Sequence, residues 1–337
     1  MELAELTTLR LGGPAGRLVE ARTDEELITA VREADRPALV IAGGSNVVVA
    51  DEGVPSTVVR IATRGVDRDD AGRLVVAAGE SWDDLVELTV AEGLQGFECL
   101  SGIPGSVGAT PIQNVGAYGQ EVAETIGSVR VYDRETDRVI DVPAAECGFG
   151  YRTSVFRYHD RHVVLSVTFR LRPTDRSGPL HYAELARTLG VPVGGTAPLA
   201  AVREAVLELR RGKGMVIDPA DPDSVSAGSF FTNPILDRAG YEALIARAGT
   251  GLSPPAWPEP DGRIKTSAAW LIERAGFRRG HGNGRVGIST KHTLALVNRG
   301  GATTAELMSL ASEIAGGVEE RFGVSLHPEP VLVGHTW

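Results

Sequence analysis

The sequence has few of the features that mark secreted, metal-binding or membrane-spanning proteins. Only two of its 337 residues are cysteines, Cys99 and Cys147, too few for a disulfide framework or a structural zinc site. No stretch approaches the ~18 consecutive apolar residues of a membrane helix. The first residues, MELAELTTLRLGG, have neither a basic leader nor an apolar run, so no signal peptide is predicted. We therefore expect a cytoplasmic protein without membrane insertion and without a bound metal.

Basic residues are outnumbered by acidic ones, 34 to 44, which gives a formal net charge of −10 at pH 7. A surface that tracks phosphates usually carries a basic excess, so the charge argues against a nucleic-acid partner. The hydrophobic fraction of 42% is ordinary for a globular protein, and at ~150 residues per domain the length predicts about two domains. Glycine is abundant, with 41 residues, which indicates many tight turns or close backbone approaches.

Three glycine-rich loops stand out, at 42–46 (AGGSN), 101–108 (SGIPGSVG) and 113–119 (QNVGAYG). None of them matches a G-x-G-x-x-G that follows a strand, or the G-x-x-x-x-G-K-[ST] of P-loop proteins. Loops of this kind expose backbone N–H groups without obstruction by a Cβ atom, and such groups receive phosphate oxygens. Any one of them is equally compatible with an ordinary turn. Three together favour a ligand.

Apolar periodicity predicts a mixed α/β chain. Short strands are expected on both sides of the first loop within 37–49, at 58–61, at 74–77, at three places within 127–172, and at 294–297. Helices are predicted at 24–34, where Thr23 and Glu26 form a capping pair, and at 82–91, 198–211, 236–248, 267–275 and 304–322. The stretch 213–229 carries two Asp-Pro pairs and is predicted to be a loop-like linker, with a domain boundary within 175–220.

The order of several longer motifs resembles the UDP-N-acetylenolpyruvoylglucosamine reductase (MurB) family. The resemblance runs from about Thr8 to Gly334. Its most specific part is IPGSVGA followed by QNVGAYG, GYRTSVF and GSFFTNP. The motifs that carry it are GGSNVVVAD, SGIPGSVGATPIQNVGAYGQE, CGFGYRTSVFR, AGSFFTNP, AAWLIERAG, KHTLALVN and FGVSLHPEPVLVG.

The resemblance implies an α+β (mixed α/β) flavoprotein of the vanillyl-alcohol-oxidase-like (PCMH-type) superfamily. It implies a two-lobed FAD-binding domain, with subdomains at 1–65 and 66–215, and a smaller substrate-binding domain at 216–337 whose last residues return to the FAD lobe. FAD is bound non-covalently and does the hydride chemistry, while side chains supply orientation and charge. The residues implied to hold it are Gly43, Gly44, Ser45, Asn46, Ile103, Pro104, Gly105, Ser106, Gly108, Thr110, Asn114, Gly116, Ala117 and Tyr118.

The implied reaction is reduction of an enolpyruvyl nucleotide sugar, with NADPH as reductant, in peptidoglycan precursor synthesis and hence in cell-wall biogenesis. The implied partners are small molecules only, and the protein is expected to be a monomer. Substrate-binding residues are implied at four positions. These are Tyr182, Lys213, Asn233 and His292.

Three residues match the family's catalytic positions. Arg152 resembles its charge-stabilising arginine, and a guanidinium binds a carboxylate through two parallel hydrogen bonds. Ser229 resembles its proton donor. Glu329 resembles its C-terminal glutamate and is expected to be protonated or hydrogen-bonded with Arg152, since its charge would repel a substrate carboxylate. The family commonly reads L-E-P-E-V at this last motif, whereas this chain has His327 and Pro330 in the flanking places.

Other interpretations of these residues remain open. Outside the motifs, Arg152 would be assigned to a surface ion pair, Ser229 to a turn and Glu329 to the surface. At the level of function, one alternative is a flavin-dependent oxidase of the same fold. Many such oxidases tether the flavin through a His in or near the first loop, and 42–46 contains none. The other alternative is a non-catalytic nucleotide-binding relative, which would not need all three residues.

Overall fold

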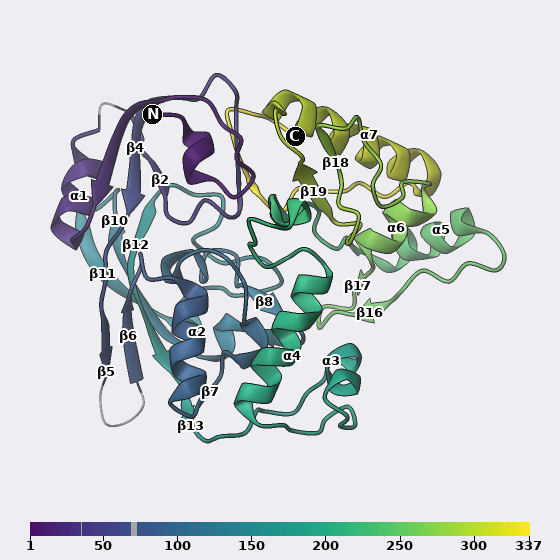
Figure 1. Cartoon of the computed structure of the whole chain (residues 1–337), viewed down its shortest axis with the longest axis horizontal. Helices are drawn as coiled ribbons and strands as arrows, with labels where there is room; N and C mark the ends of the chain where they lie inside the picture. Colours follow the sequence, from purple (N-terminus) through teal and green to yellow (C-terminus); the bar gives the residue numbers. More distant parts are fainter. Residues whose placement is uncertain (35, 69–72) are drawn as a thin grey trace. The chain divides into compact units, whose positions relative to one another are not determined.

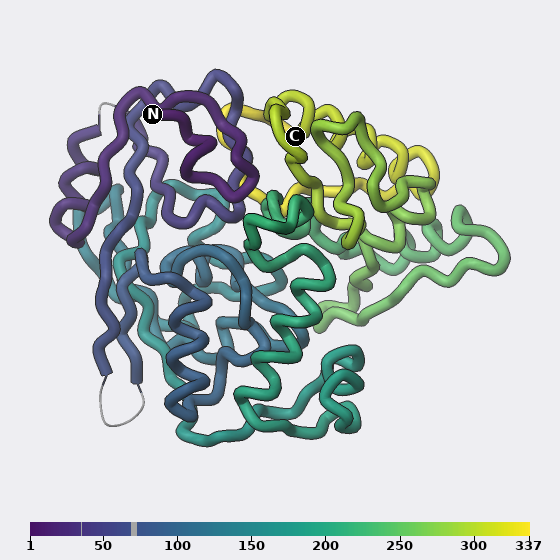
Figure 2. The backbone as a smooth tube through the Cα atoms, viewed as in Figure 1, coloured from purple at the N-terminus to yellow at the C-terminus, as the bar shows by residue number. Residues whose placement is uncertain are grey.

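The computed structural model describes residues 1–34, 36–68 and 73–337, and the chain divides into two compact units. The larger unit comprises Ala15–Gly44 and Pro55–Gly212, and the smaller unit comprises Met1–Pro14, Ser45–Val54 and Lys213–Trp337. The path of the chain can be followed in Figure 2. The expected division into 1–65, 66–215 and 216–337 stays a prediction.

The larger unit is built on a five-stranded antiparallel sheet and a smaller three-stranded one (Figure 1). The five-stranded sheet has the order β11 (Arg138–Pro143), β10 (Ile126–Asp133), β12 (His162–Arg170), β6 (Arg73–Ala77) and β5 (Val66–Arg68). The other sheet has the order β1 (Ala15–Ala21), β4 (Val54–Ile61) and β2 (Leu39–Ile41), with β2 and β4 parallel.

An irregularity in β12 lets this strand contribute to two separate cores. Val163 and Leu165 belong to the cluster that contains α1, whereas Val164, Val167 and Phe169 belong to the cluster that contains α2. Strict alternation would place 165, 167 and 169 on one face. The register with β10 shifts between the pairs at residues 166 and 164, and a bulge of this kind re-aims the side chains that follow it.

Helices cover both faces of this sheet, and each begins at a recognisable cap. The helix α1 (Asp24–Arg32) starts after Thr23, whose side chain accepts the Glu26 N–H. On the other face lies α2 (Trp82–Ala91) (Figure 1). Its Trp82 is buried against Phe97 and Phe169. The remaining helices are α3 (Ala183–Thr188) and α4 (Leu199–Gly212), and the remaining short strands are β7 (Leu94–Gln95), β8 (Gly116–Ala117), β9 (Gln120–Glu121) and β13 (Arg172–Pro173).

The smaller unit packs helices on a three-stranded antiparallel sheet. The sheet has the order β14 (Ser226–Ser229), β19 (Ala295–Asn298) and β18 (Val286–Ile288), and the core beneath α7 (Thr304–Phe322) includes Leu307, Ile314 and Val318. Its other helices are α5 (Arg238–Ala248) and α6 (Ala268–Arg274). Its other short strands are β15 (Ile235–Leu236), β16 (Trp257–Pro258) and β17 (Ile264–Lys265).

Residues from the beginning of the chain complete the smaller unit. The strand β3 (Val47–Val49) pairs in parallel with β20 (Val331–Val333) near the C-terminus. The carboxylate of Asp51 accepts the N–H groups of Thr304 and Ala305 (2.7 and 2.9 Å), and so caps α7. The N-terminal segment, purple in Figure 2, is held by a bond from Asn298 Nδ2 to Leu9 O (2.9 Å).

The mixed α/β class and the six predicted helices are confirmed, with α2 and α7 at their predicted bounds. The expectation of a loop throughout 213–229 is wrong at its end, because Ser226–Ser229 pairs with β19 as β14. The patterns also missed β1, whose burial does not alternate, and the glycine-containing β18. Among the described residues, none of the helices combines the length and apolarity needed to cross a bilayer. Both cysteines are buried, and burial raises the pKa of the Cys147 thiol to about 11.

Candidate functional site

The first and second glycine-rich loops meet in the larger unit. A Cβ atom on Gly43 would lie 2.9 Å from the Cα of Gly105, closer than real Cβ atoms come. Two backbone hydrogen bonds attach the second loop to the segment before α2: Val107 N donates to Glu80 O and Gly108 N donates to Ala78 O (both 2.9 Å). The two loops can therefore touch through their backbones only because glycine stands at position 43.

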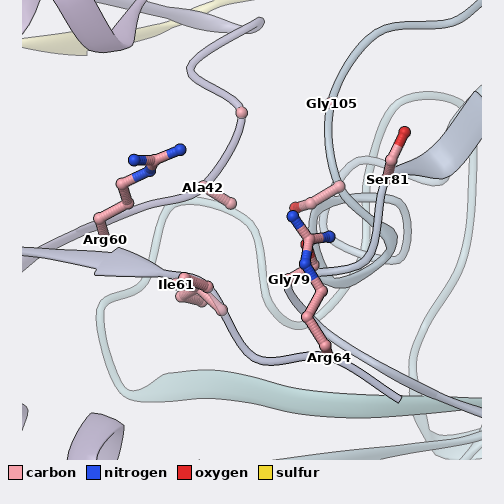
Figure 3. A pocket seen from close by; sticks show the side chains of 10 residues that line it. Ala42, Arg60, Ile61, Arg64, Gly79, Ser81 and Gly105 are labelled. Carbon is pink, nitrogen blue, oxygen red and sulfur yellow. The ribbon is translucent and has the colours of Figure 1, made fainter. Parts of the chain in front are cut away.

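A cavity of about 160 Å³ opens where these loops meet (Figure 3). Its walls come from the first loop, the end of β4, the turn before α2 and the second loop. They comprise Ala42, Gly43, Arg60, Ile61, Ala62, Arg64, Gly79, Ser81, Gly105 and Ser106. In Figure 3 the Arg64 side chain extends toward Gly79, whose carbonyl oxygen accepts a hydrogen bond from it.

The lining of this cavity suits an anionic group such as the diphosphate of FAD. Ser106 is 5% exposed, and its Oγ has no hydrogen-bond partner among the described residues, so a ligand oxygen could satisfy it. Ser81 is the N-cap of α2, and the positive end of a helix dipole favours negative charge. The guanidinium groups of Arg60 and Arg64 lie at the wall, where they are paired with the carboxylates of Glu20 and Glu80 (3.0 and 3.3 Å). The residues present therefore fit the cofactor that the resemblance implies.

Several other residues expected to hold FAD make contacts within the protein core or with neighbouring backbone. The Thr110 hydroxyl donates to Val107 O at 2.8 Å, and Gly108 packs directly on Ala78. Ile103 and Ala117 pack against the core beneath α2. Of the fourteen residues expected to hold FAD, only Gly43, Gly105 and Ser106 line the cavity itself.

The third loop is joined to the segment that carries Arg152. Asn114 is 1% exposed, and its side-chain amide donates to Glu121 Oε2 (2.7 Å) and Gly150 O (3.1 Å). Its Oδ1 accepts the Ala123 N–H at 3.1 Å. These three hydrogen bonds make Asn114 a brace between the loop and the turn at Gly150.

Arg152 stands in that turn with a left-handed backbone, at φ +50°. Gly150 and Thr153 exchange backbone hydrogen bonds across it (3.1 and 3.3 Å). Arg152 Nη2 donates to Gly116 O at 2.8 Å, and a Cβ atom on Gly116 would lie 3.3 Å from Arg152 Nη1. The guanidinium therefore contacts the backbone of the third loop. This contact brings a residue expected to be catalytic, Arg152, next to one expected to hold FAD, Gly116.

Tyr118, expected to bind cofactor, and Tyr182, expected to bind substrate, are in contact. Their ring centroids are 5.2 Å apart in an edge-to-face arrangement, and Tyr182 remains 42% exposed. Gly119 adopts φ +83°, and a Cβ atom there would meet the Tyr182 backbone nitrogen at 3.7 Å. The third loop therefore borders both predicted subsites within the larger unit.

Ser229 and Glu329 lie on neighbouring segments of the smaller unit. Ser229 ends β14, and the Glu329 N–H donates to the carbonyl oxygen of Phe230 at 2.8 Å. Phe230 and Phe231, which follow Ser229, are each 1% exposed, with ring centroids 5.1 Å apart, and belong to the core of this unit. Arg152 belongs to the larger unit and not to this one.

The first glycine-rich loop is divided between the units. Gly43 and Gly44 belong to the larger unit, and Ser45 and Asn46 to the smaller one. Asn46 O accepts the Val331 N–H at 2.9 Å, and Asn46 Nδ2 reaches Glu329 O at 3.5 Å. A residue expected to bind FAD is therefore attached both to the first residue of β20 and to Glu329, which precedes this strand.

Asp223 holds two segments expected to bind substrate. Its buried carboxylate accepts Thr290 N at 2.9 Å and the Thr290 hydroxyl, which fixes the loop that carries His292. A Cβ atom on Gly214, next to Lys213, would lie 2.9 Å from the Asp223 Cβ. Burial alone would raise the pKa of Asp223, but hydrogen bonds from Thr290 and Ser289 outweigh this and lower it.

Asn233, also expected to bind substrate, is fixed at the start of α6. Its Oδ1 accepts the Ala268 N–H at 3.0 Å.

Sequence patterns did not identify Arg60, Arg64, Gly79, Ser81 or Asp223 as site residues. A signal was available for Ser81, because Ser three residues before Asp84 at the start of a predicted helix is a cap pattern. Arg60 and Arg64 follow a predicted strand, a position that by itself carries no chemistry. In the described ranges no group of three His, Cys, Asp or Glu side chains could hold a metal ion.

Comparison with known protein families gives two matches that together span most of the chain. Residues 15–142 match the family model of an FAD binding domain. Residues 219–333 match that of the C-terminal domain of UDP-N-acetylenolpyruvoylglucosamine reductase. The cavity lies within the first matched range, and Ser229 and Glu329 lie within the second.

Individual relatives are similar over nearly their whole length. The UDP-N-acetylenolpyruvoylglucosamine reductase of Thermobifida fusca is 56% identical, over 99% of this chain and 97% of its own. The reductase of Salinispora arenicola is 60% identical, over 98% of this chain and 94% of its own. The crystal structure of MurB from Thermus caldophilus is 27% identical, covers 99% of this chain and 97% of its own, and superposes with a TM-score of 0.67.

Proposed function

The chain belongs to the UDP-N-acetylenolpyruvoylglucosamine reductase family, and on that basis we propose that it reduces UDP-N-acetylglucosamine enolpyruvate to UDP-N-acetylmuramate with NADPH. It is an FAD-dependent oxidoreductase. The proposed setting is peptidoglycan precursor synthesis in the cytoplasm, with a monomeric enzyme and small-molecule partners. When bound, FAD supplies the hydride chemistry that no side chain can perform.

The proposed role of Arg152 follows from where charge develops. A hydride that reaches the methylene carbon of an enolpyruvyl ether pushes an electron pair onto the adjacent carbon and its carboxylate. The resulting enediolate-like anion needs a fixed cation. A guanidinium is a permanent cation and can bind a carboxylate through two parallel hydrogen bonds. Its bond to Gly116 O, at 2.8 Å, supports the proposal because it limits the positions that the guanidinium can take.

Ser229 is proposed to give its hydroxyl proton to the carbon that carries the negative charge. A hydroxyl is a weak acid in water, but a carbanionic centre is a far stronger base and can take its proton. The buried rings of Phe230 and Phe231 restrict water on one side of Ser229, which limits competing protonation by solvent. Glu329 is proposed to act in its protonated form, since a second carboxylate charge would repel the substrate.

The observation that carries this proposal is the hydrogen bond from Glu329 N to Phe230 O, 2.8 Å long. It joins the segment of the proposed proton donor to that of the proposed glutamate, although 100 residues separate them in the sequence. A protein that only bound nucleotides would have no use for a hydroxyl and a carboxyl on neighbouring segments beside two buried phenylalanines.

The test is a turnover assay of the purified yellow protein with the enolpyruvyl nucleotide sugar, comparing NADPH with NADH. The expected result is oxidation of NADPH that depends on the sugar, together with formation of the lactyl ether product. Flavin that NADPH reduces but only O₂ reoxidises would instead indicate the oxidase alternative. Colourless protein that cannot be reconstituted with FAD would indicate the non-catalytic one.

A further inference from the structure

Trp337, the last residue of the sequence, contacts both segments that carry the proposed catalytic pair of the smaller unit. Its indole N–H donates to the carbonyl oxygen of Leu326 at 3.0 Å. Its ring lies 5.8 Å from that of Phe231, at an interplanar angle of 56°. One side chain therefore touches the segment that leads to Glu329 and the segment that follows Ser229.

The two segments are held together by few backbone hydrogen bonds. Glu329 N donates to Phe230 O (2.8 Å), Thr232 N donates to His327 O (3.0 Å), and Phe231 and Pro328 lie opposite each other. Proline has no N–H group, so neither Pro328 nor Pro330 can add a donor on either side of Glu329. The Glu329 N–H is thus the only backbone donor that residues 328–330 can offer.

The side chain of Trp337 is placed to compensate for these missing donors. The last backbone hydrogen bond between the two segments ends at His327 O. The indole of Trp337 binds the carbonyl oxygen of the preceding residue, Leu326, and so adds one further hydrogen bond next to it. The aromatic contact holds Phe231, which is 1% exposed and cannot move without disturbing the core. Trp337 is itself 46% exposed, so it lies over this junction without being part of the core.

We propose that Trp337 is a positioning residue that fixes the register of residues 326–329 against 230–232, and thereby the distance between the Glu329 carboxyl and the Ser229 hydroxyl. It acts through these two groups and does not touch the reacting atoms. The inference rests on the proposed function, because it assigns the proton-transfer step to Ser229 and Glu329. A displacement of about 1 Å at such a pair can slow a reaction by up to ~100-fold.

The test compares Trp337→Ala and Trp337→Phe with Trp257→Ala. Trp257 is a matched control, since it is also 46% exposed and lies in β16 of the same unit. Trp337→Ala should slow reoxidation of the reduced flavin by the enolpyruvyl nucleotide sugar about tenfold, and should leave reduction by NADPH unchanged. Trp337→Phe keeps a ring against Phe231 but loses the N–H, so it should fall between the wild type and the alanine variant. Trp257→Ala should match the wild type in both half-reactions.

Amide hydrogen exchange provides a readout that does not depend on activity. In Trp337→Ala, peptides that contain the amides of Glu329 and Thr232 should exchange several-fold faster, while peptides from α7 should be unchanged. Unchanged exchange at both amides would overturn the inference, as would an equal slowing of both half-reactions. If the alanine variant does not fold, the half-reaction rates and the amide exchange of Trp337→Phe test the inference instead. Failure of the proposed function would be distinguishable, because the wild type would then not reoxidise with the sugar although the exchange difference would persist.

Discussion

Gly43 and Gly105 approach so closely that a Cβ atom on the first would lie 2.9 Å from the Cα of the second. The contact is between backbones, so neither partner can rotate away as a side chain could. Both residues line the cavity proposed to receive the FAD diphosphate. This contact therefore sets the width of the cavity, and it predicts a specific loss of cofactor when Gly43 acquires a side chain.

Gly43→Ala should lower FAD occupancy by at least tenfold while leaving the protein folded. The added methyl group must push the second loop away, and a shift of a few tenths of an ångström disturbs several backbone contacts at once. The measurement is the ratio of flavin to protein absorbance after purification, followed by titration with FAD. Gly316→Ala is the control, because a Cβ atom there meets nothing within 4 Å and alanine in a helix is stabilising by up to about 1 kcal/mol. Full flavin content in Gly43→Ala would show that the diphosphate lies elsewhere.

Ser229→Ala should leave flavin reduction by NADPH intact and slow reoxidation by the enolpyruvyl nucleotide sugar by roughly 10²- to 10⁴-fold, the usual range for a lost general acid. The two half-reactions are measured separately by stopped-flow absorbance of the flavin. Ser325→Ala, which removes an exposed hydroxyl of the same unit, is the control. Equal loss in both half-reactions would mean that Ser229 supports the fold of the site and is not its proton donor.

Arg152→Lys should lower kcat about 100-fold, with a smaller change in KM, because lysine keeps the charge but cannot offer two parallel hydrogen bonds. Lysine also retains a side chain at the left-handed backbone position, so the strain at φ +50° is the same in both proteins. Steady-state kinetics with the enolpyruvyl nucleotide sugar provide the measurement, and Arg130→Lys at an exposed position of β10 provides the control. An increase confined to KM would assign Arg152 to substrate binding alone.

Local patterns in the sequence were sufficient to predict six of the seven α-helices described and the main strands of the sheets, but not α3 or most of the short strands. Helices α2 and α7 were predicted to the residue from their stripes of apolar residues, and in the structure each also begins at a side-chain cap, as in Thr303 and Glu306 at the start of α7. The strand β1 was missed because its buried and exposed residues do not alternate. The linker prediction failed at Ser226–Ser229 because pairing with β19 outweighed the loop-like composition.

The site was predictable only where a motif itself forms the contact. Gly43, Gly105 and Ser106 stand in glycine-rich loops and do line the cavity, but Arg60 and Arg64 reach it from the end of β4, which no local pattern shows. Asn114 was expected at the cofactor, and the structure additionally makes it a brace for the Gly150 turn. The contact of Trp337 with Phe231 spans more than 100 residues and depends on tertiary packing alone.

The lowered pKa of Asp223 predicts how stability responds to acid. The folded-state pKa lies below that of the unfolded chain, so the carboxylate stabilises the fold at any pH above ~4, its ordinary unfolded value. That contribution is lost as the pH falls from this value toward the folded-state pKa. Asp223→Asn should therefore lower stability by about 2 kcal/mol at pH 7, since it weakens the charge-assisted hydrogen bonds from Thr290.

The measurement is the melting temperature of wild type and Asp223→Asn across pH 7 to 3. The difference between the two should be constant from pH 7 to 5 and should shrink below pH 4. Asp261→Asn is the control, because Asp261 also has a lowered pKa, from its backbone and side-chain hydrogen bonds with Arg263, but its pairing is exposed and contributes little. Asp223→Asn should also raise KM more than it lowers kcat, because the loops beside Lys213 and His292 lose their shared anchor. A melting difference that grows as the pH falls would contradict the assignment of Asp223 as an ionised anchor.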